Sequence, residues 1–169
     1  MKKTVALILA LLMLVALCAC TSSDNGGGKT HEAYVFKKGD VEIAIDADLA
    51  PIVEKLGDPI YYDDAPSCAH EGTSKYYTYA GIDIESYPKD GKDLVYMVAL
   101  LDDTVSTVEG LRVGDSREDV IKIYGEPDTD SERSLLYKAE GMYLHVVMTN
   151  KGKTVSQIQY MHKDAMDNE

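Results

Sequence analysis

The apolar positions between residues 116 and 124 predict a short helix. Val120, Ile123 and Tyr124 recur at the spacing i, i+3, i+4, which places their side chains on one face of a helix. A helix of about nine residues is unstable by itself in water. We therefore expect this helix to bury its apolar face against another element.

The sequence also predicts where this helix begins and ends. Ser116 and Asp119 have the spacing of a capping box, in which each side chain bonds the backbone N–H of the other residue. Gly125 can adopt the left-handed conformation that ends a helix, and Pro127 prevents its continuation. The predicted helix is therefore short and fixed at both ends.

A similar pattern lies 68 residues upstream and predicts a second helix at residues 48–56. Asp48 is its expected N-terminal cap, and Pro51 lies in the first turn, where proline is tolerated. Gly57 and Pro59 end it in the same way. Its expected buried face consists of Leu49, Ile52, Val53 and Leu56. A pattern that recurs at a fixed offset indicates an internal repeat.

Apolar runs before, between and after these helices predict strands. Residues 41–45 alternate apolar and polar side chains, as a half-buried strand does. The other expected strands are residues 75–80, 82–87, 94–101, 134–139, 142–149 and 154–161. Residues 61–74 are polar and rich in turn-forming residues, so we predict a loop there.

These elements predict an α+β fold built from two tandem repeats, residues 33–104 and 105–169. Each repeat would consist of one helix and three strands. The two repeats would form one antiparallel sheet with the helices on one face. The other face of the sheet would be open to a partner.

The N-terminus predicts export and a lipid anchor. Lys2 and Lys3 precede an uncharged apolar run, residues 4–17, which is typical of a signal peptide. The run ends in Leu17-Cys18-Ala19-Cys20, which resembles a bacterial lipobox. The resemblance implies that residues 1–19 are removed and that Cys20 carries a lipid, followed by a flexible tether at residues 20–32. The alternative is an ordinary secretory signal that is cleaved nearby.

Charge and cysteine content limit the possible partners. Removing 19 residues, including Lys2 and Lys3, from the 169-residue chain leaves 150 residues and changes the net charge from −12 to −14. Such an acidic protein repels nucleic acid and anionic headgroups, so the membrane contact would be the lipid. With Cys20 lipidated, Cys68 is the one remaining thiol, and no disulfide can form within the chain.

One sequence pattern resembles a known family. It consists of Gly114, Ser116, Asp119, Val120, Tyr124, Gly125, Pro127, Tyr137, Gly152, Lys153, Val155 and Ile158. This pattern is similar to the tandem-repeat family of the beta-lactamase inhibitory protein and to small outer-membrane assembly lipoproteins of the SmpA/OmlA type. The first half carries it only partly, because Asp46 replaces the first glycine. The whole chain also resembles uncharacterised lipoproteins of Gram-positive bacteria. The resemblance implies protein binding through the sheet face, without catalysis.

The sequence offers few residues for catalysis or metal binding. Cys68 and His70 are spaced as a nucleophile and base could be, but no orienting residue is evident near them. Asp63 or Asp64 could join them as metal ligands, although no second ligand pair is present. We therefore expect no enzyme activity, cofactor or metal.

Strand parity predicts the binding residues. If alternate apolar side chains face the core, the open face carries Asp83, Glu85, Tyr87, Tyr143, His145, Gln157 and Gln159. This set is acidic and aromatic, which suits a basic protein or peptide. We expect a lipid-anchored extracytoplasmic protein-binding module on the cell surface. The alternatives are a thiol enzyme that depends on Cys68 and an architectural lipoprotein of envelope assembly.

Overall fold

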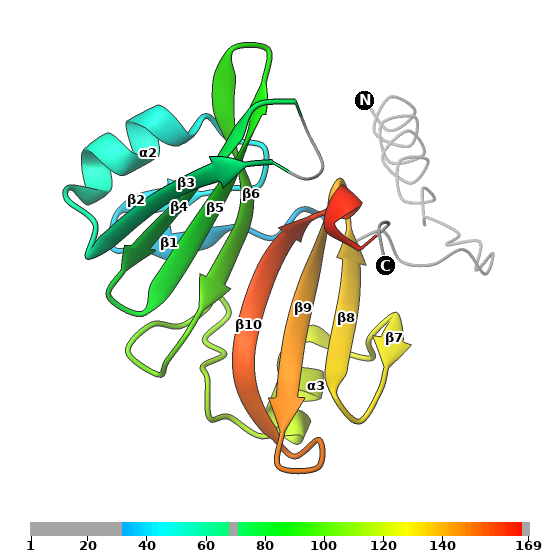
Figure 1. Ribbon diagram of the computed structural model, residues 1–169. Coiled ribbons are helices and arrows are strands. Elements are labelled where there is room, and N and C mark those ends of the chain that lie inside the picture. Colours follow the sequence, from blue (N-terminus) through cyan, green and yellow to red (C-terminus); the bar gives the residue numbers. More distant parts are fainter. Residues whose placement is uncertain (1–31, 68–70, 167–169) are drawn as a thin grey trace, which may run out of the picture.

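The computed structural model describes residues 32–67 and 71–166. Its main feature is an antiparallel eight-stranded sheet with the order β3-β4-β5-β6-β10-β9-β8-β7 (Figure 1). Its strands are β3 (Tyr61–Pro66), β4 (Thr73–Tyr79), β5 (Ile82–Lys89), β6 (Lys92–Leu100), β7 (Thr129–Asp130), β8 (Ser134–Ala139), β9 (Met142–Thr149) and β10 (Thr154–His162). The other elements are a two-stranded sheet of β1 (Phe36–Lys38) and β2 (Val41–Ile43), the helices α2 (Leu49–Leu56) and α3 (Arg117–Tyr124), and the 3-10 helix η1 (Lys163–Ala165).

This architecture contradicts the predicted fold class. The protein is mostly β, with an eight-stranded sheet and a second small sheet in place of two helix-plus-three-strand repeats. The predicted polar loop contains β3, which pairs with β4 over six residues. β3 could not be predicted from the sequence, because its side chains show no apolar alternation. It is an edge strand that is largely exposed on both faces.

The predicted helix ends are confirmed. The Ser116 hydroxyl accepts the N–H of Asp119 at 3.2 Å, and the Asp119 carboxylate accepts the N–H of Ser116 at 3.2 Å, so the capping box is complete. Gly125 follows α3 with a φ of 80°. At the other helix, Asp48 accepts the N–H of Ala50 at 3.2 Å. Both helices were predictable because these signals are local in sequence.

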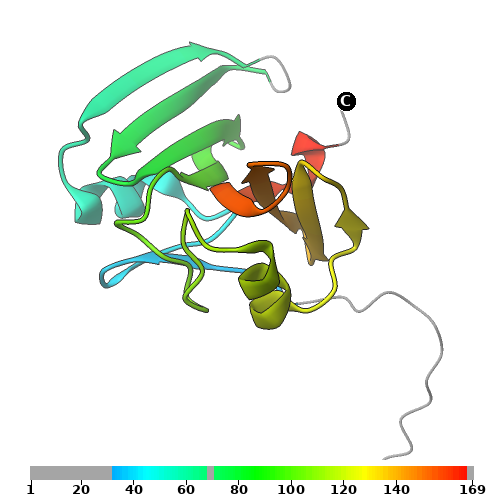
Figure 2. The same ribbon diagram turned by 90° about the horizontal axis from the view of Figure 1, so that it is seen from below.

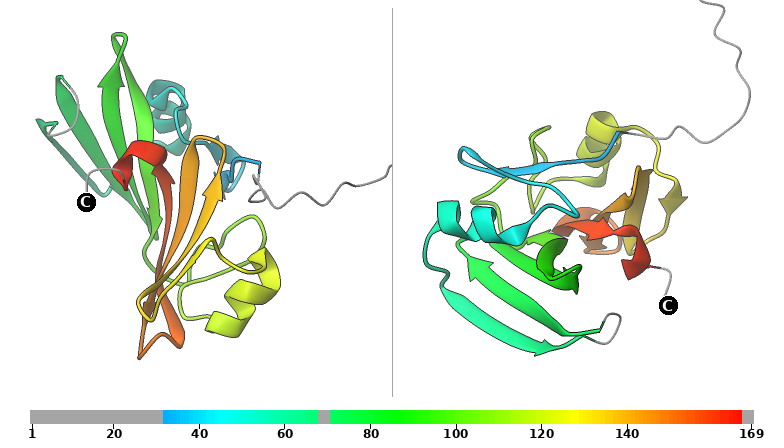
Figure 3. Two further views of the ribbon diagram at one scale, coloured as in Figure 1. Left: turned by 90° about the vertical axis from the view of Figure 1, so that its right-hand side faces the viewer. Right: turned by 90° about the horizontal axis from the view of Figure 1, so that it is seen from above.

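One hydrophobic core lies between the large sheet and a covering layer. We define the covering layer as β1, β2, α2, α3 and the loop between β6 and α3, which lie on one side of the sheet (Figures 2 and 3). It supplies buried Phe36, Ile43, Leu49, Ile52, Leu111, Val120 and Tyr124. The sheet supplies, among others, Ile82, Ile84, Val98, Leu144, Val146, Ile158 and Tyr160. The β1–β2 hairpin thus covers sheet surface that was predicted to lie under helices alone.

A short seam joins the two halves of the large sheet. β6 and β10 pair through Met97–Leu100 and Ile158–Met161, four residues on each strand. Past Met161 the chain turns into η1, and the upper part of β6 continues without β10 beside it (Figure 1). We call the region beyond the seam, where β6 and β10 are no longer paired, the notch.

Candidate functional site

The sheet face opposite the core brings most of the predicted binding residues together. Along β5, Ile82 and Ile84 are buried in the core, so Asp83 and Glu85 project from the other face. The same alternation holds in β9 and β10. We call this surface the open face; it carries Asp83, Glu85, Tyr143, His145, Gln157 and Gln159, all partly exposed.

Strand register aligns the open face into two rows of side chains. One row crosses all eight strands through Tyr61, Thr78, Asp83, Ala99, Gln159, His145, Leu136 and Thr129. The other crosses seven strands through Asp63, Tyr76, Glu85, Met97, Met161, Tyr143 and Lys138. Side chains directly opposite on neighbouring strands are within contact distance. The rows therefore make one continuous surface across the seam.

A chain of hydrogen-bonded polar side chains lies on the part of the open face formed by β9 and β10. His145 Nδ1 lies 2.8 Å from Gln159 Oε1, and the Gln159 amide donates to Gln157 Oε1 at 3.0 Å. With the Gln159 oxygen as acceptor, His145 donates from Nδ1, which leaves Nε2 directed elsewhere. Three of the predicted residues are thus fixed in place relative to one another before any partner binds.

Two carboxylates next to the seam are poorly compensated. Asp83 Oδ1 is buried and has no hydrogen-bond partner within residues 32–67 and 71–166. Burial raises the pKa of the Glu85 carboxyl, and a hydrogen bond from Tyr76 offsets this only in part. A buried carboxylate oxygen without a donor is unfavourable. A cationic group bound between Asp83 and Glu85 would supply the donor that Asp83 Oδ1 lacks and would stabilise the ionised form of Glu85.

Tyr87 does not belong to the open surface, which corrects one predicted site residue. Its side chain is only 3% exposed, and its hydroxyl donates to Asp46 Oδ1. Between Glu85 and Ser86 the register shifts so that Tyr96 has no partner on β5, and Tyr96 and His162 pack against the Tyr87 ring. Burial and the Asp46 carboxylate together raise the pKa of Tyr87.

The notch beside the seam gathers residues that sequence reasoning missed. Tyr87 packs against Tyr96, with ring centroids 5.6 Å apart, and against His162 at 5.4 Å. His162 lies 3.5 Å from carboxylate oxygens of both Asp46 and Asp164. A polar cavity of about 590 Å³ opens here. Its residues come from four distant segments, so no local motif could reveal it.

Several predicted features lie outside the described residues. The lipidation site Cys20 and the pair Cys68 and His70 are among them. Within residues 32–67 and 71–166, no cluster of three His, Cys, Asp or Glu side chains could hold a metal ion. No helix in these same ranges is long and apolar enough to cross a membrane.

The fold is similar to solved structures of proteins with distant sequences. An extracellular protein containing a SCP domain from Bacillus anthracis has a TM-score of 0.56 at 14% identity, covering 77% of this chain and 49% of that one. A cysteine-rich secretory protein from Staphylococcus aureus has a TM-score of 0.52 at 15% identity, covering 81% and 50%. The uncharacterized protein yfeY from Escherichia coli has a TM-score of 0.46 at 16% identity, covering 76% and 99%.

These comparisons correct the family resemblance suggested by the sequence. The structures from Bacillus anthracis and Staphylococcus aureus are a SCP-domain protein and a cysteine-rich secretory protein, not members of the inhibitory-protein family or of the SmpA/OmlA type. No family model matches the chain, and no curated protein matches it significantly. The chain spans about half the length of the first two structures, and the likeness concerns the fold alone.

Proposed function

We propose that this protein is a lipid-anchored, extracytoplasmic binding module that holds a basic protein segment on its open face. The observation that carries the proposal is the pair of carboxylates at the seam, Asp83 and Glu85, placed in two continuous rows of side chains. Tyr76 and Tyr143 lie in the same row as Glu85 and offer large contact areas with few rotatable bonds.

The chemistry of this face favours a cationic partner. A guanidinium or ammonium group can supply the donor that Asp83 Oδ1 lacks. The same group would stabilise ionised Glu85, whose pKa is raised by burial. Apolar Met97 and Met161 lie between these carboxylates and Tyr143, where they can contact the aliphatic parts of a bound segment. The open face would therefore bind both the charged group and the aliphatic stem of a partner side chain.

The proposed location combines two kinds of support. The similar structures from Bacillus anthracis and Staphylococcus aureus are described as extracellular and secretory, which agrees coarsely with an extracytoplasmic protein. The lipid anchor is supported by the lipobox-like sequence that ends at Cys20. Labelling of cells with an alkyne fatty acid tests it: wild type becomes labelled and Cys20→Ala does not. Labelled Cys20→Ala, or unlabelled wild type, would contradict the anchor.

A photo-crosslinking experiment tests the open face itself. A benzoylphenylalanine side chain replaces Tyr143 on the open face or, as a control, exposed Lys55 on α2. In cells that make the full chain, irradiation should give a specific adduct with a basic protein from position 143 only. The adduct should decrease about tenfold in Asp83→Asn/Glu85→Gln, the size expected when central contacts are lost. An equal adduct from position 55, or one that persists in the double variant, would contradict the proposal.

A further inference from the structure

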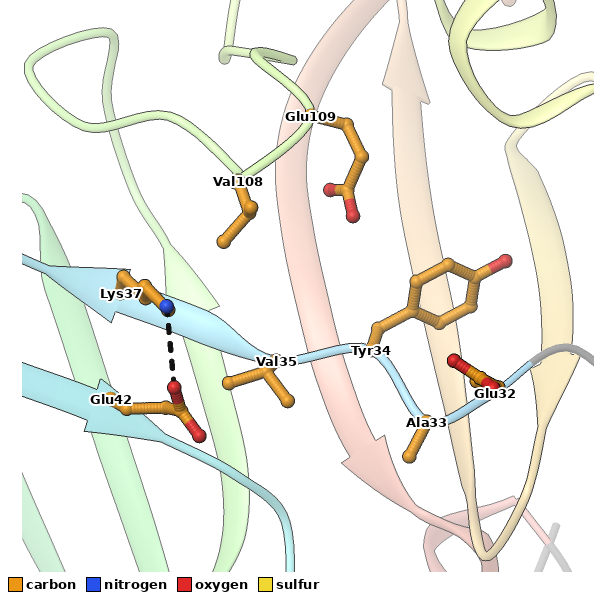
Figure 4. A pocket seen from close by; sticks show the side chains of 8 residues that line it. All are labelled: Glu32, Ala33, Tyr34, Val35, Lys37, Glu42, Val108 and Glu109. Carbon is orange, nitrogen blue, oxygen red and sulfur yellow. Dashed lines mark ion pairs between the residues drawn. The ribbon is translucent and has the colours of Figure 1, made fainter.

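A second concave site lies in the covering layer, across the sheet from the open face. Figure 4 shows it between the chain leading into β1 and the loop before α3. We call this cavity of about 490 Å³ the trough; it is lined by Glu32, Ala33, Tyr34, Val35, Lys37, Glu42, Val108 and Glu109. None of these residues belongs to the open face, so the two sites can be tested independently.

A tight turn in the loop before α3 forms one wall of the trough. The N–H of Thr107 bonds the Leu111 carbonyl at 2.9 Å, and the N–H of Gly110 bonds the Thr107 carbonyl at 3.0 Å. Gly110 has a φ of 98°, a conformation that favours glycine. The turn leaves Val108 57% exposed at the rim although it is apolar. An exposed valine beside a concave site is available to contact a ligand.

The charges of the lining residues do not cancel. Lys37 pairs with Glu42 at 3.3 Å, which uses the one lining cation. Glu32 and Glu109 are then left without a cation among the residues that line the trough. The lining as a whole carries three carboxylates against one ammonium group, a formal charge of −2. The excess negative charge is at the end of the trough away from the Lys37–Glu42 pair (Figure 4).

The end of the trough that carries this charge is rigidly built. The Tyr124 hydroxyl donates to Glu109 Oε2 at 2.8 Å, which orients the carboxylate without neutralising it. Tyr34 packs edge-on against Tyr124, with ring centroids 5.7 Å apart. In Figure 4 the Tyr34 ring is drawn between the Glu32 and Glu109 side chains. An aromatic ring with carboxylates beside it attracts a cation electrostatically.

The buried residues around Glu109 are consistent with its uncompensated charge. The hydroxyl of Tyr160 is buried near Thr107. Burial raises the pKa of Tyr160 most, and the nearby Glu109 carboxylate raises it further. Glu109 also raises the pKa of Tyr34, after burial. The negative field of Glu109 thus acts on two tyrosines, and no cationic side chain lines the trough at this end.

We propose that the trough binds an alkylammonium group, with the charge at Glu32 and Glu109 and the aliphatic stem along Val35 and Val108. A metal ion is a poorer fit, because no cluster of three ligating side chains exists within residues 32–67 and 71–166 and hard cations take six or more oxygens. A lysine side chain of a partner and a free alkylamine share this chemistry.

Two-dimensional amide NMR of the full chain in detergent micelles tests the proposal. The probes are n-butylammonium and Nα-acetyl-lysine methylamide, and the matched neutral probe is the Nε-acetylated lysine derivative. Both cations should shift the amides of Tyr34, Val108 and Glu109 saturably, with a dissociation constant of roughly 1 mM, as is usual for such small ligands. Tighter binding of the lysine derivative would indicate a partner side chain, and equal binding a free amine.

Charge variants decide whether the carboxylates bind the probe. The double variant Glu32→Gln/Glu109→Gln should weaken binding at least tenfold, because it removes both carboxylate charges. A glutamine at position 109 can still accept from Tyr124, so the fold should be kept. Glu54→Gln makes the same charge change on an exposed site of α2 and should bind as wild type does. In each variant, amide signals of residues away from the trough that match those of wild type show that the fold is kept. Absence of saturable shifts, equal binding of the neutral probe, or full binding by the double variant would each overturn the proposal.

Discussion

The starts of α2 and α3 have a similar backbone, but Asp46 stands at the first where Gly114 stands at the second. The N–H of Asp46 bonds the Val95 carbonyl at 2.9 Å, and the N–H of Gly114 bonds the Val155 carbonyl at 2.8 Å. Both residues have positive φ, 66° at Asp46 and 96° at Gly114. Glycine adopts such a conformation freely, whereas an aspartate does so at a cost. The chain therefore keeps a carboxylate at one helix start where the other has no side chain.

The ends of the two helices are also alike. Gly57 and Gly125 each end a helix with positive φ, and each donates its N–H to a carbonyl four residues back. The hydroxyl of Tyr79 donates to the Gly57 carbonyl at 3.3 Å, and that of Tyr137 donates to the Gly125 carbonyl at 3.0 Å. The two halves differ in what precedes the helix, since the covering β1–β2 hairpin precedes α2 alone.

The difference at position 46 shows what the carboxylate contributes. Asp46 accepts from Tyr87 on β5 and lies 3.5 Å from His162 at the end of β10. It therefore connects the start of α2 with strands from both halves of the sheet, at the notch where β6 and β10 separate. Gly114 makes no such connection. A strained backbone conformation is retained where the side chain joins separate elements.

Tyr87→Ala should have the largest effect on stability among the changes considered. The ring is 3% exposed and contacts Tyr96 and His162. Its removal should lower the free energy of unfolding by about 3–5 kcal/mol, as for other buried aromatic residues. Urea unfolding with an unchanged slope measures it. Tyr143→Ala on the open face is the control, with an expected change within about 1 kcal/mol.

If Tyr87→Ala also changed stability by less than about 1 kcal/mol, the notch would not hold the two halves together. Asp46 would then resemble Gly114 in importance. If Tyr143→Ala instead unfolded the domain, Tyr143 would belong to the core and the open face would be misassigned.

The helix starts themselves can be compared by matched substitutions. Gly114→Ala places a Cβ where nothing lies within 4 Å, so its cost is the backbone conformation alone, about 1–2 kcal/mol. Asp46→Asn keeps an acceptor for Tyr87 and tolerates positive φ, so it should be within about 0.5 kcal/mol of wild type. Thermal unfolding at pH 7 measures both. A loss at Asp46→Asn as large as that at Gly114→Ala would show that the charge, toward His162, is required.

The cap of α3 and the parity of β5 are two parts of the fold that could be predicted from the sequence. The cap of α3 was predictable because Ser116 and Asp119 are three residues apart and Gly125 follows directly. The parity of Asp83 and Glu85 was predictable because Ile82 and Ile84 flank them with regular alternation. Local periodicity determines both.

Other features depend on distant contacts. β3 was missed because exposed edge residues are not selected for apolar alternation. Tyr87 was predicted to be exposed, but Tyr96 and His162 pack against its ring. The notch required Asp46 and His162, more than 100 residues apart, to meet. The trough requires the approach to β1 to lie beside the loop at Val108. None of these pairings has a signal in a short stretch of sequence.

Ser116→Ala should have a smaller effect than the changes above. It removes the hydroxyl from the capping box, which should cost about 1 kcal/mol. Asp48→Asn keeps an acceptor for Ala50 at the other helix and loses only the exposed ion pair with Lys92, so its effect should be smaller still. Urea midpoints of the two variants compare the caps. Equal losses would mean that the complete capping box adds nothing over the single bond at α2.

The smallest expected effect separates the two caps by their response to salt. The pKa of Asp119 is lowered first by the Ser116 hydroxyl, whereas that of Asp48 is lowered first by Lys92. Because both folded pKa values lie below the unfolded value of about 3.9, each carboxylate stabilises the fold above that pH. This stability is lost as the pH falls through the folded pKa.

Salt at about 1 M screens exposed ion pairs but not hydrogen bonds between neighbouring groups. Carboxyl carbon NMR titrations should therefore show the pKa of Asp48 rising toward its ordinary value in salt or in Lys92→Met, while that of Asp119 stays low. Ser116→Ala should raise the pKa of Asp119 and leave that of Asp48 unchanged. If salt shifted both carboxyls equally, the two helix starts would be held by the same electrostatic interaction, and the hydroxyl of Ser116 would not distinguish them.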